Sequence, residues 1–181
     1  MKDVKYYLKV TLSLLLICTV VAGLLAVVNS LTVDVIAANA QKERRRAVSG
    51  FFPVMTSMED EKGEWPEGVN AVYTVHAGNV WLGYAVDLNS RGFGGDINMI
   101  VGLGTDGRVC GVRVISHAET PGLGSRATLA DYLDNFIGVG ERLTIKQDVD
   151  AISGATISSK AVVAGINLAL SLGLGGAEAH G

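Results

Sequence analysis

The sequence predicts an α+β protein in which one N-terminal membrane-spanning helix precedes an antiparallel sheet packed against helices. Three observations predict this class: a 24-residue stretch without charge near the N-terminus, two hairpin patterns after residue 70, and two later stretches with helical spacing of apolar residues. Strands followed by helices along a chain are typical of α+β folds. What remains of the 181 residues after the apolar stretch suits one domain with a modest core.

The uncharged stretch runs from Val10 to Val33. At about 1.5 Å per residue, a helix of this length covers roughly 36 Å, which exceeds a bilayer core of about 30 Å. A cleaved secretory signal is the competing interpretation, because lysines precede the stretch and Ala38-Asn39-Ala40 resembles a cleavage site. Signal peptides have apolar regions of about 7–15 residues, so the length favours an uncleaved anchor.

Basic residues flank the predicted span on both sides, so the positive-inside rule leaves its orientation nearly balanced. The N-terminal side carries Lys2, Lys5 and Lys9, and the C-terminal side carries Lys42, Arg44, Arg45 and Arg46. We interpret the three arginines as the solvated face of a helix that continues from residue 37 to residue 48.

The span divides the chain into a cytoplasmic N-terminus at residues 1–9, a transmembrane helix at 10–33, a helical extension and linker at 34–69, and a folded domain at 70–181. Residues 49–69 contain two of the three prolines in a polar, acidic context, which indicates a linker.

Two hairpins are predicted at the start of the domain. Residues 71–76 and 80–88 flank a turn at 77–79, and residues 97–104 and 108–115 flank Thr105-Asp106-Gly107. Alternation predicts which side chains share a face of each strand. The predicted sets are Leu82, Tyr84, Val86 and Leu88, then Ile97, Met99, Val101 and Leu103, and finally Cys110, Val112 and Val114.

Two helices are predicted after the hairpins. One begins at Thr128, where Thr-x-x-Asp resembles a capping box, and has an apolar stripe of Leu129, Tyr132, Leu133, Phe136 and Ile137. The second runs from about residue 156 to residue 172, with Ala161, Val162, Ile166, Ala169 and Leu170 facing inward.

Composition excludes several classes of function. Beyond residue 33 the chain carries 12 basic and 17 acidic side chains, a formal charge of −5, so it lacks the basic surface of a nucleic-acid-binding protein. Cys18 lies in the apolar span and Cys110 in a predicted strand, which excludes an intramolecular disulfide. With three histidines and no Cys-x-x-Cys or His-Glu-x-x-His spacing, no metal site is expected. Redox work by this chain would therefore require an organic cofactor.

One glycine motif, Gly102-Leu103-Gly104-Thr105-Asp106-Gly107, matches the G-x-G-x-x-G fingerprint of dinucleotide-binding folds. That fingerprint needs a following helix at the pyrophosphate, whereas here a strand follows and Asp106-Gly107 suits a hairpin turn. We therefore interpret this motif as a turn.

Two other segments are candidates for binding. The loop at residues 117–124 joins a strand to a helix and contains two glycines, which allow main chain to approach a ligand, although a plain connection explains it equally well. Small residues at 150–160 open the last helix, where free N–H groups and the helix dipole favour a phosphate. The alternative for this segment is an ordinary helix cap by Ser153 or Thr156.

Three motifs together resemble a known family: Gly92-Phe93-Gly94-Gly95, Glu-Thr-Pro-Gly-Leu-Gly at 119–124, and Asp-x-x-Ser-Gly-Ala-Thr at 150–156. This order resembles the flavin-binding G subunit of the Rnf electron-transport complex and is similar to the C subunit of the sodium-translocating NADH:quinone reductase. The resemblance covers nearly the whole chain, and the short length favours Rnf.

The resemblance implies an FMN-binding domain in which a flavin transferase links FMN, taken from FAD, to Thr156 through a phosphoester. It also implies the cofactor-binding residues Glu119, Thr120, Pro121, Gly122, Leu123, Gly124, Ser153, Gly154, Ala155 and Ser158. Asp150 is expected to help present this segment to the transferase, and His117 is left out of the site.

For the whole protein, the resemblance implies an electron-transfer subunit without independent catalytic activity. Its expected partners are the other Rnf subunits in the membrane, and through them ferredoxin and NAD, in a complex that moves sodium ions or protons. The flavin domain of this family lies outside the cytoplasm, which implies a cytoplasmic N-terminus in a single-pass inner-membrane protein.

Three alternatives stay open. The chain could be the quinone-reductase subunit or a free-standing anchored FMN carrier. It could also be a single-span structural subunit without cofactor, in which residues 150–156 only cap a helix. A hydrolase is the most distant alternative, because the chain has no Gly-x-Ser-x-Gly elbow.

Overall fold

The computed structural model describes residues 2–174, without the side chains of residues 2–4, 34, 35 and 37, so the end of the predicted domain, residues 175–181, lies outside it. The chain forms two compact units, residues 1–42 and residues 43–181. Helix α1, Lys2–Phe51, is the one helix in the described chain that is long and apolar enough to cross a membrane. Its side chains from residue 10 to residue 33 are all exposed, as expected of a segment that faces lipid.

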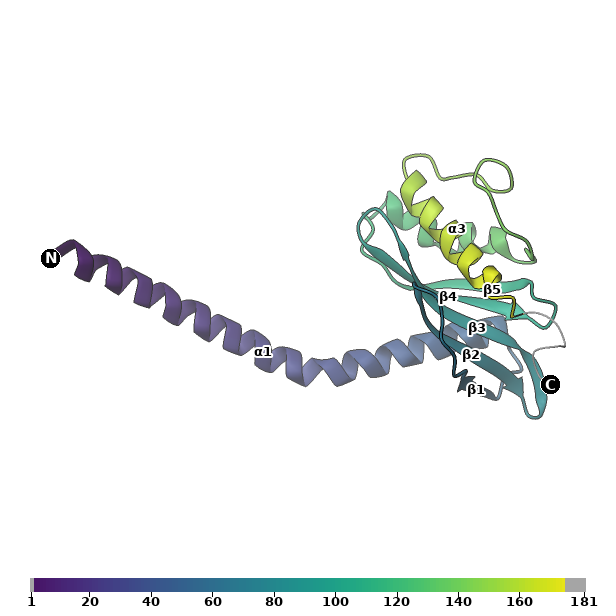
Figure 1. Cartoon of the computed structure of the whole chain (residues 1–181), viewed down its shortest axis with the longest axis horizontal. Coiled ribbons are helices and arrows are strands. Elements are labelled where there is room, and N and C mark those ends of the chain that lie inside the picture. Colours follow the sequence, from purple (N-terminus) through teal and green to yellow (C-terminus); the bar gives the residue numbers. More distant parts are fainter. Residues whose placement is uncertain (1, 175–181) are drawn as a thin grey trace. The chain divides into compact units, whose positions relative to one another are not determined.

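The second unit contains a five-stranded antiparallel sheet in which each strand pairs with the next one along the chain (Figure 1). Its strands are β1 (Ser57–Asp60), β2 (Val69–Ala77), β3 (Val80–Arg91), β4 (Asp96–Gly104) and β5 (Val109–Ser116). Both predicted hairpins are present, and Gly78 and Gly107 have positive φ in their turns. The G-x-G-x-x-G match is therefore part of the β4–β5 hairpin.

Strand β1 was not predicted, because residues 49–69 were interpreted as a linker. The strand pairs with β2 from Ser57↔His76 to Asp60↔Tyr73, and the Thr74 hydroxyl donates to Oε2 of Glu61 at 2.7 Å. Backbone pairing of a short edge strand requires no alternating apolar pattern, which is the signal that sequence analysis uses. Residues 43–69 are therefore part of the compact unit.

Two register shifts correct the predicted faces. The β2–β3 register shifts between Val75 and His76, and Leu82 then packs against the opposite face from Tyr84. The β4–β5 register shifts at Gly102, and Cys110 likewise leaves the face of Val112. A bulge inserts one residue, which reverses the alternation beyond it.

Short helices follow β5: η1 (Gly124–Thr128), α2 (Ala130–Leu133) and η2 (Asp134–Phe136). The predicted capping box at Thr128 is wrong, because α2 begins after Leu129 and the Thr128 hydroxyl donates to the Ser125 carbonyl at 2.8 Å. The predicted last helix is confirmed as α3, Thr156–Ser171.

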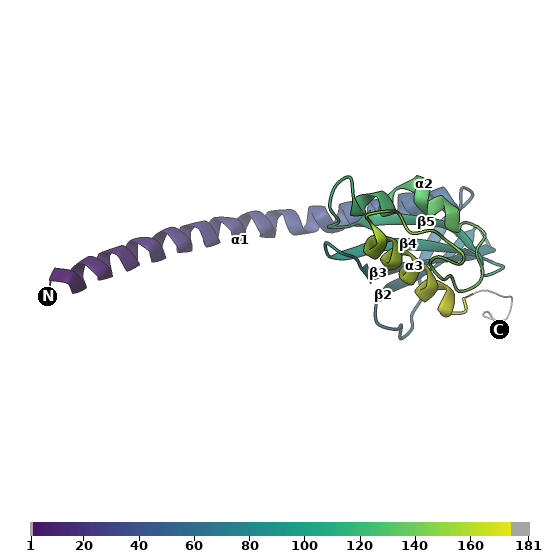
Figure 2. The same ribbon diagram turned by 90° about the horizontal axis from the view of Figure 1, so that it is seen from above.

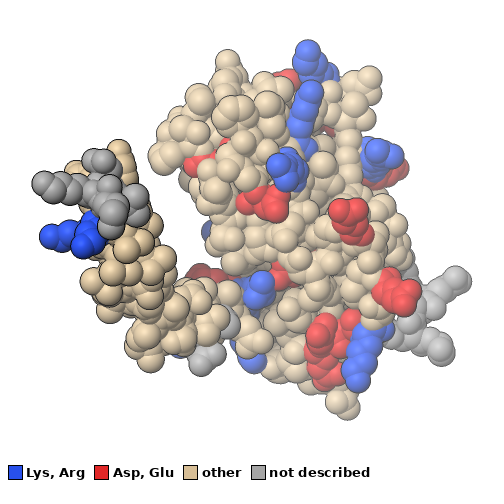
Figure 3. Space-filling view, turned by 60° about the vertical axis from the view of Figure 1, so that its left-hand side comes forward, with Lys and Arg blue, Asp and Glu red and all other residues tan. Residues whose placement is uncertain are grey.

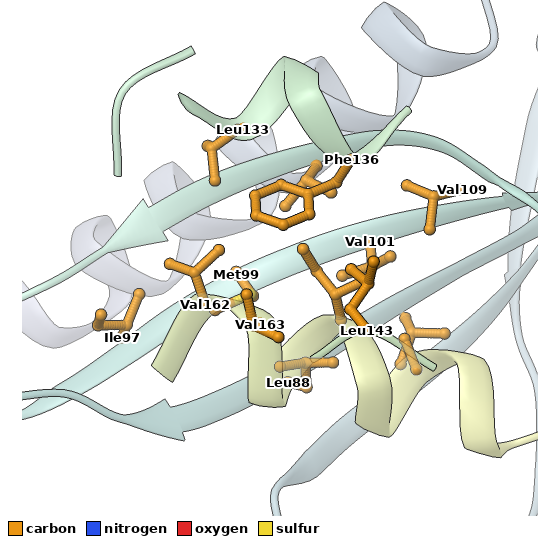
Figure 4. Close-up of a cluster of buried hydrophobic side chains, with 14 of the residues drawn as sticks. Leu88, Ile97, Met99, Val101, Val109, Leu133, Phe136, Leu143, Val162 and Val163 are labelled. Carbon is orange, nitrogen blue, oxygen red and sulfur yellow. The ribbon is translucent and has the colours of Figure 1, made fainter. Parts of the chain in front are cut away.

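The main core lies between one face of the sheet and α2, η2 and α3, which cover that face in Figure 2. Tyr132, Leu133 and Phe136 of the predicted stripe are buried, whereas Leu129 and Ile137 are exposed. Figure 4 shows Leu133, Phe136, Val162 and Val163 directed toward the strand residues; the core also includes Leu88, Ile97, Met99, Val101, Val109 and Leu143. This packing fixes the start of α3 against the sheet.

The end of α1 packs on the other face of the sheet within the second unit. Ala47, Val48 and Phe52 are buried there with Val75, Ala85 and Ile100. Arg44 was predicted to be solvated, yet it forms an ion pair with the buried carboxylate of Asp87. On the face shown in Figure 3, acidic and basic side chains of the domain are interspersed.

Candidate functional site

Three segments that are distant in sequence meet at one end of the sheet. The first is the tip of the β3–β4 hairpin, where the Gly92 N–H donates to the Gly95 carbonyl at 2.9 Å. The Phe93 side chain at this tip is 70% exposed. An aromatic residue that projects from a tight, glycine-rich turn is available to contact a ligand.

The second segment is the loop at residues 117–124, which follows β5. Its turn is held by the Leu123 N–H, which donates to the Thr120 carbonyl at 3.2 Å. The Glu119 N–H donates to Nδ1 of His117 at 3.2 Å, so His117 supports the loop and lies outside the cavity lining. Glu119 itself is only 4% exposed.

The third segment is the start of α3. Gly154 has φ of +79°, and the chain then enters the helix with Ala155 as its N-cap. Neither Ser153 nor Thr156 caps the helix, since no side chain makes a cap hydrogen bond at this end. Within the described chain, no group accepts a hydrogen bond from the N–H of residues 156–158, as is usual for the first turn of a helix. These N–H groups form a site that favours an anion.

The carboxylate of Glu119 joins the three segments. Its Oε1 accepts hydrogen bonds from the Phe93 N–H at 2.8 Å and the Gly94 N–H at 3.2 Å. Its Oε2 accepts one from the Ser158 hydroxyl at 2.6 Å. The hairpin tip, the loop and the helix are thus linked through one buried side chain.

These segments enclose a cavity of about 280 Å³. It is lined by Phe93, Glu119, Thr120, Leu123, Gly124, Gly154, Ala155, Thr156, Ile157 and Ser158. Its walls are mostly apolar, and Phe93, Leu123 and Ile157 are each about half exposed or more. Apolar walls with a few placed polar groups are typical of a cofactor site.

Thr156, the residue predicted to carry the cofactor, is exposed at this cavity. Its hydroxyl makes no hydrogen bond to any other described residue, which leaves it free to react. By contrast, the hydroxyl of Ser158 is engaged by Glu119, and Ser158 is only 1% exposed. Of the three hydroxyls in the first turn of the helix, those of Thr156, Ser158 and Ser159, only that of Thr156 is therefore accessible, because Ser159 is also buried.

The cavity contains eight of the eleven residues predicted to attach or bind the cofactor, and Pro121, Gly122 and Ser153 are absent from its lining. Sequence analysis missed Phe93 and Ile157. Phe93 did carry a signal, since it is an aromatic residue flanked by glycines in a motif that supported the family resemblance. Ile157 could have been found as an apolar residue outside the inward-facing stripe of α3.

Asp150 and Ser153 lie at a different cleft, of about 530 Å³, which also involves Arg126 and Asp148. The Tyr132 hydroxyl donates to the Asp150 carbonyl at 3.3 Å at this cleft. Burial raises the pKa of Tyr132 above its ordinary value, so its hydroxyl remains a donor. Asp150 is exposed and lies outside the lining of the cavity that Thr156 borders.

Comparisons with known proteins agree with this geometry. Residues 92–171 match the FMN-binding domain family, a range that includes every residue of the cavity, and residues 1–49 match the RnfG N-terminal region. The chain is 34% identical to the G subunit of the ion-translocating oxidoreductase complex of Methanosarcina acetivorans, over 94% of this chain and 96% of the relative.

Other relatives carry more specific names. The G subunit of a proton-translocating ferredoxin:NAD(+) oxidoreductase complex from Clostridium ljungdahlii is 36% identical over 54% of this chain and 57% of its own length. The G subunit of a Na(+)-translocating ferredoxin:NAD(+) oxidoreductase complex from Acetobacterium woodii is 32% identical over 59% of this chain and 56% of its own length.

Proposed function

This chain belongs to the family of G subunits of ion-translocating oxidoreductase complexes and contains an FMN-binding domain. From that premise we propose that it is a membrane-anchored electron relay in a ferredoxin:NAD oxidoreductase complex. FMN is joined to Thr156 through a phosphoester. The names of two relatives, as subunits of ferredoxin:NAD(+) complexes, support this assignment of the complex.

The observation that carries the proposal is the hydroxyl of Thr156. It is exposed at the first residue of α3, beside free N–H groups and at the edge of an apolar cavity. A phosphate on this oxygen would lie at a helix N-terminus, where the helix dipole and free amides stabilise negative charge. Gly154 and Ala155 are small residues, which leave room for the chain between phosphate and flavin ring.

Attachment requires a flavin transferase with FAD as its second substrate. The Thr156 oxygen forms a bond to the phosphorus on the FMN side of FAD, and the bond between the two phosphates breaks. AMP leaves, and the hydroxyl proton passes to a base of the transferase. The exposure of Asp150 outside the cavity supports our proposal that this enzyme recognises its side chain.

FMN, when bound, supplies one- and two-electron redox chemistry, and the protein supplies position and environment. Phe93, Leu123 and Ile157 provide apolar surface for a flat ring, and Thr120 provides a polar contact. Within the described part of the chain, the lining contains one ionisable side chain, that of Glu119, and its oxygens accept hydrogen bonds from the protein.

The partners follow from the same assignment: the other subunits in the membrane, and through them ferredoxin and NAD. The N-terminus lies in the cytoplasm and the FMN domain lies on the opposite side of the membrane, as the family resemblance implies; the basic residues on both sides of the span do not decide it. Labelling of intact cells with a membrane-impermeant maleimide tests this orientation. Gln147→Cys should react and Lys5→Cys should not, and the reverse pattern would overturn the orientation.

The attachment is tested by producing the chain together with an active flavin transferase. After denaturation, the wild type should fluoresce in the gel and be heavier by one FMN less one water. Thr156→Ala should be dark and unmodified. Ser153→Ala and Ser158→Ala are the matched controls, since each removes a neighbouring hydroxyl and should keep the added mass.

Each other outcome identifies a different function. A wild type that stays dark with an active transferase would leave a cofactor-free structural subunit. A modified wild type that is purified with quinone-reductase subunits, or alone, would instead indicate the quinone-reductase subunit or a free-standing FMN carrier.

A further inference from the structure

Glu119, which was expected to bind the cofactor, lines the cavity, and its carboxylate also has partners within the protein. All three of its hydrogen bonds come from the protein: two from backbone N–H groups of the hairpin tip and one from the Ser158 hydroxyl. A carboxylate has about four acceptor sites, so most of its capacity is used within the protein. The residue is also 4% exposed, which leaves little of it for a ligand.

Three glycines around Glu119 lie so close to its carboxylate or to its backbone neighbour that no side chain fits at their positions. A Cβ atom on Gly92 would overlap with Oε1, and one on Gly124 would overlap with Oε2. A Cβ atom on Gly94 would overlap with the carbonyl of Ala118, the residue before Glu119. The hairpin tip and the loop can therefore reach the carboxylate only because these positions lack side chains.

The groups that Glu119 bonds to belong to two walls of the cavity, which come from different segments. Oε1 binds the hairpin that carries Phe93, and Oε2 binds the first turn of α3, two residues after Thr156. The hairpin tip is otherwise closed on itself, since the bond from the Gly92 N–H to the Gly95 carbonyl runs within the tip. One carboxylate thus bonds to both walls, and a second link between β3 and α3, from the Ser90 hydroxyl to the Ala161 carbonyl at 2.6 Å, lies outside the cavity lining.

We infer that Glu119 is a positioning residue, which sets the distance between Phe93 and the flavin attachment point by bridging the hairpin tip to α3. This inference rests on the proposed function for its effect on FMN, while the bridge itself exists without the cofactor. The length of the Glu119 side chain, and not its charge, is the property that the bridge requires, because the side chain must contact both walls at once. We call this length its reach.

Three variants separate reach from charge. Glu119→Ala removes the bridge. Glu119→Asp keeps a carboxylate but is one methylene shorter, so it cannot hold both walls. Glu119→Gln keeps the reach: its amide oxygen accepts from the Phe93 N–H, and its amide N–H₂ donates to the Ser158 hydroxyl oxygen. If Glu119→Ala does not fold, Glu119→Asp provides the same test with a smaller change.

The first measurement uses the flavin-free, full-length protein in detergent and follows hydrogen exchange of the backbone amides. The N–H groups of Phe93 and Gly94 should exchange about tenfold faster or more in Glu119→Ala and Glu119→Asp, because the side chain no longer reaches these amides and α3 together and the hydrogen bonds that protect the amides are lost. Glu119→Gln should stay within a few-fold of the wild type. Unchanged exchange in the alanine and aspartate variants would overturn the bridge.

The second measurement uses the flavin-loaded protein. The alanine and aspartate variants should keep FMN on Thr156, but with higher flavin fluorescence and lower anisotropy than the wild type, while Glu119→Gln stays close to it. Glu61→Gln and Glu61→Ala are the controls, since the Glu61 carboxylate accepts a bond from the Thr74 hydroxyl at the far strands. They should leave the flavin signal unchanged.

The two measurements distinguish failure of the proposed attachment from failure of the inference about Glu119. A wild type without flavin would overturn the proposed attachment, and it would not affect the exchange result for the bridge. A loaded protein whose flavin signal is the same in all Glu119 variants would overturn the positioning role and leave the attachment intact. A glutamine variant that behaves like alanine would overturn the inference that reach, and not charge, is what matters.

Discussion

Arg44, close to the end of α1, forms an ion pair with Asp87 in the middle of β3, and the Asp87 side chain is only 1% exposed. The other carboxylate oxygen of Asp87 accepts hydrogen bonds from the side-chain amides of Asn70 at 2.9 Å and Asn98 at 2.8 Å. The buried charge of Asp87 thereby links the end of α1 to the sheet, and its partners come from α1, β2 and β4.

Replacing Arg44 with Met should destabilise the domain, because Asp87 then keeps its amide partners but loses its counter-charge. We expect a loss of about 1–3 kcal/mol in the free energy of unfolding, the usual cost of leaving a buried polar group partly unpaired. Urea unfolding of the full-length chain in detergent, followed by the fluorescence of Trp65 and Trp81, measures this loss.

Arg45→Met is the matched control for Arg44→Met. Arg45 is exposed and forms no ion pair with another described residue, so its replacement should change the free energy of unfolding by less than about 0.5 kcal/mol. Equal losses in the two variants would mean that the Arg44–Asp87 pair contributes nothing to stability.

Two glycines of the 117–124 loop should respond differently to alanine. A methyl group on Gly124 would overlap with Glu119 Oε2 and come within 2.8 Å of the Ser158 hydroxyl, so Gly124→Ala should cost roughly 1–3 kcal/mol and release the hairpin tip. Gly122 has open space around its Cβ position but φ of +74°, so Gly122→Ala should cost about 1–2 kcal/mol of backbone strain only.

The two loop variants are expected to lose similar amounts of stability, so a stability measurement alone does not distinguish them. Hydrogen exchange at the Phe93 amide does. Exchange should accelerate in Gly124→Ala and stay near the wild-type rate in Gly122→Ala under conditions where both are folded. Acceleration in Gly122→Ala alone would show that strain in the loop, and not the Glu119 contact, controls the hairpin tip.

Much of the fold was predictable because its signals are local. The turns at Gly78 and Gly107 and the helix at Thr156–Ser171 each follow from a few consecutive residues, and the structure has them. The wrong faces of Leu82 and Cys110 arise at bulges, where one extra residue reverses an otherwise regular pattern. A bulge has no unique sequence signal, so alternation alone could not find it.

The sequence predicted two of the segments that line the cavity, the 117–124 loop and the start of α3, but not how the segments come together. Glu119 and Ser158 are 39 positions apart, and Glu119 and Phe93 are 26 apart. Their meeting depends on where the β3–β4 hairpin and α3 end, which is a property of the packed sheet. Sequence analysis assigned Glu119 to the cofactor from the resemblance, and it could not show that the carboxylate also bonds to Phe93, Gly94 and Ser158.

Cys110 should be unreactive in the folded protein. Burial raises the pKa of its thiol from 9.0 to about 11, so at pH 8 the thiolate fraction is roughly 100-fold below that of an ordinary thiol. In a Cys18→Ser chain, iodoacetamide should modify Cys110 slowly until urea unfolds the domain. A native rate equal to the unfolded rate would contradict this expectation.

The same shift in the pKa of Cys110 makes the free energy of unfolding depend on pH. The thiol ionises at a lower pH in the unfolded state than in the folded state, so alkaline pH stabilises the unfolded state. The contribution of Cys110 to stability is complete below about pH 9 and decreases as the pH rises toward 11. Cys110→Ala should remove this alkaline decrease, as urea unfolding at pH 8 and pH 10.5 can measure.

The ring of Phe51, the last residue of α1, lies against two glycines that face each other across β4 and β5. Gly102 pairs with Gly111 in the register, and a Cβ atom on Gly111 would overlap with the Phe51 ring. Gly111→Ala should therefore cost roughly 1–3 kcal/mol, because the ring must move out of a close-packed position. Urea unfolding in detergent measures the loss.

A double-mutant cycle with Phe51→Ala tests whether the Phe51 ring is the cause. Once the ring is absent, Gly111→Ala should cost much less, since the methyl group then occupies the space that the ring has left. Gly50→Ala is the control on the helix: nothing lies within 4 Å of its Cβ position, so alanine should raise stability by about 0.5–1 kcal/mol through helix propensity. Equal costs of Gly111→Ala with and without the ring would show that the strain arises within the sheet and that the contact with α1 is incidental.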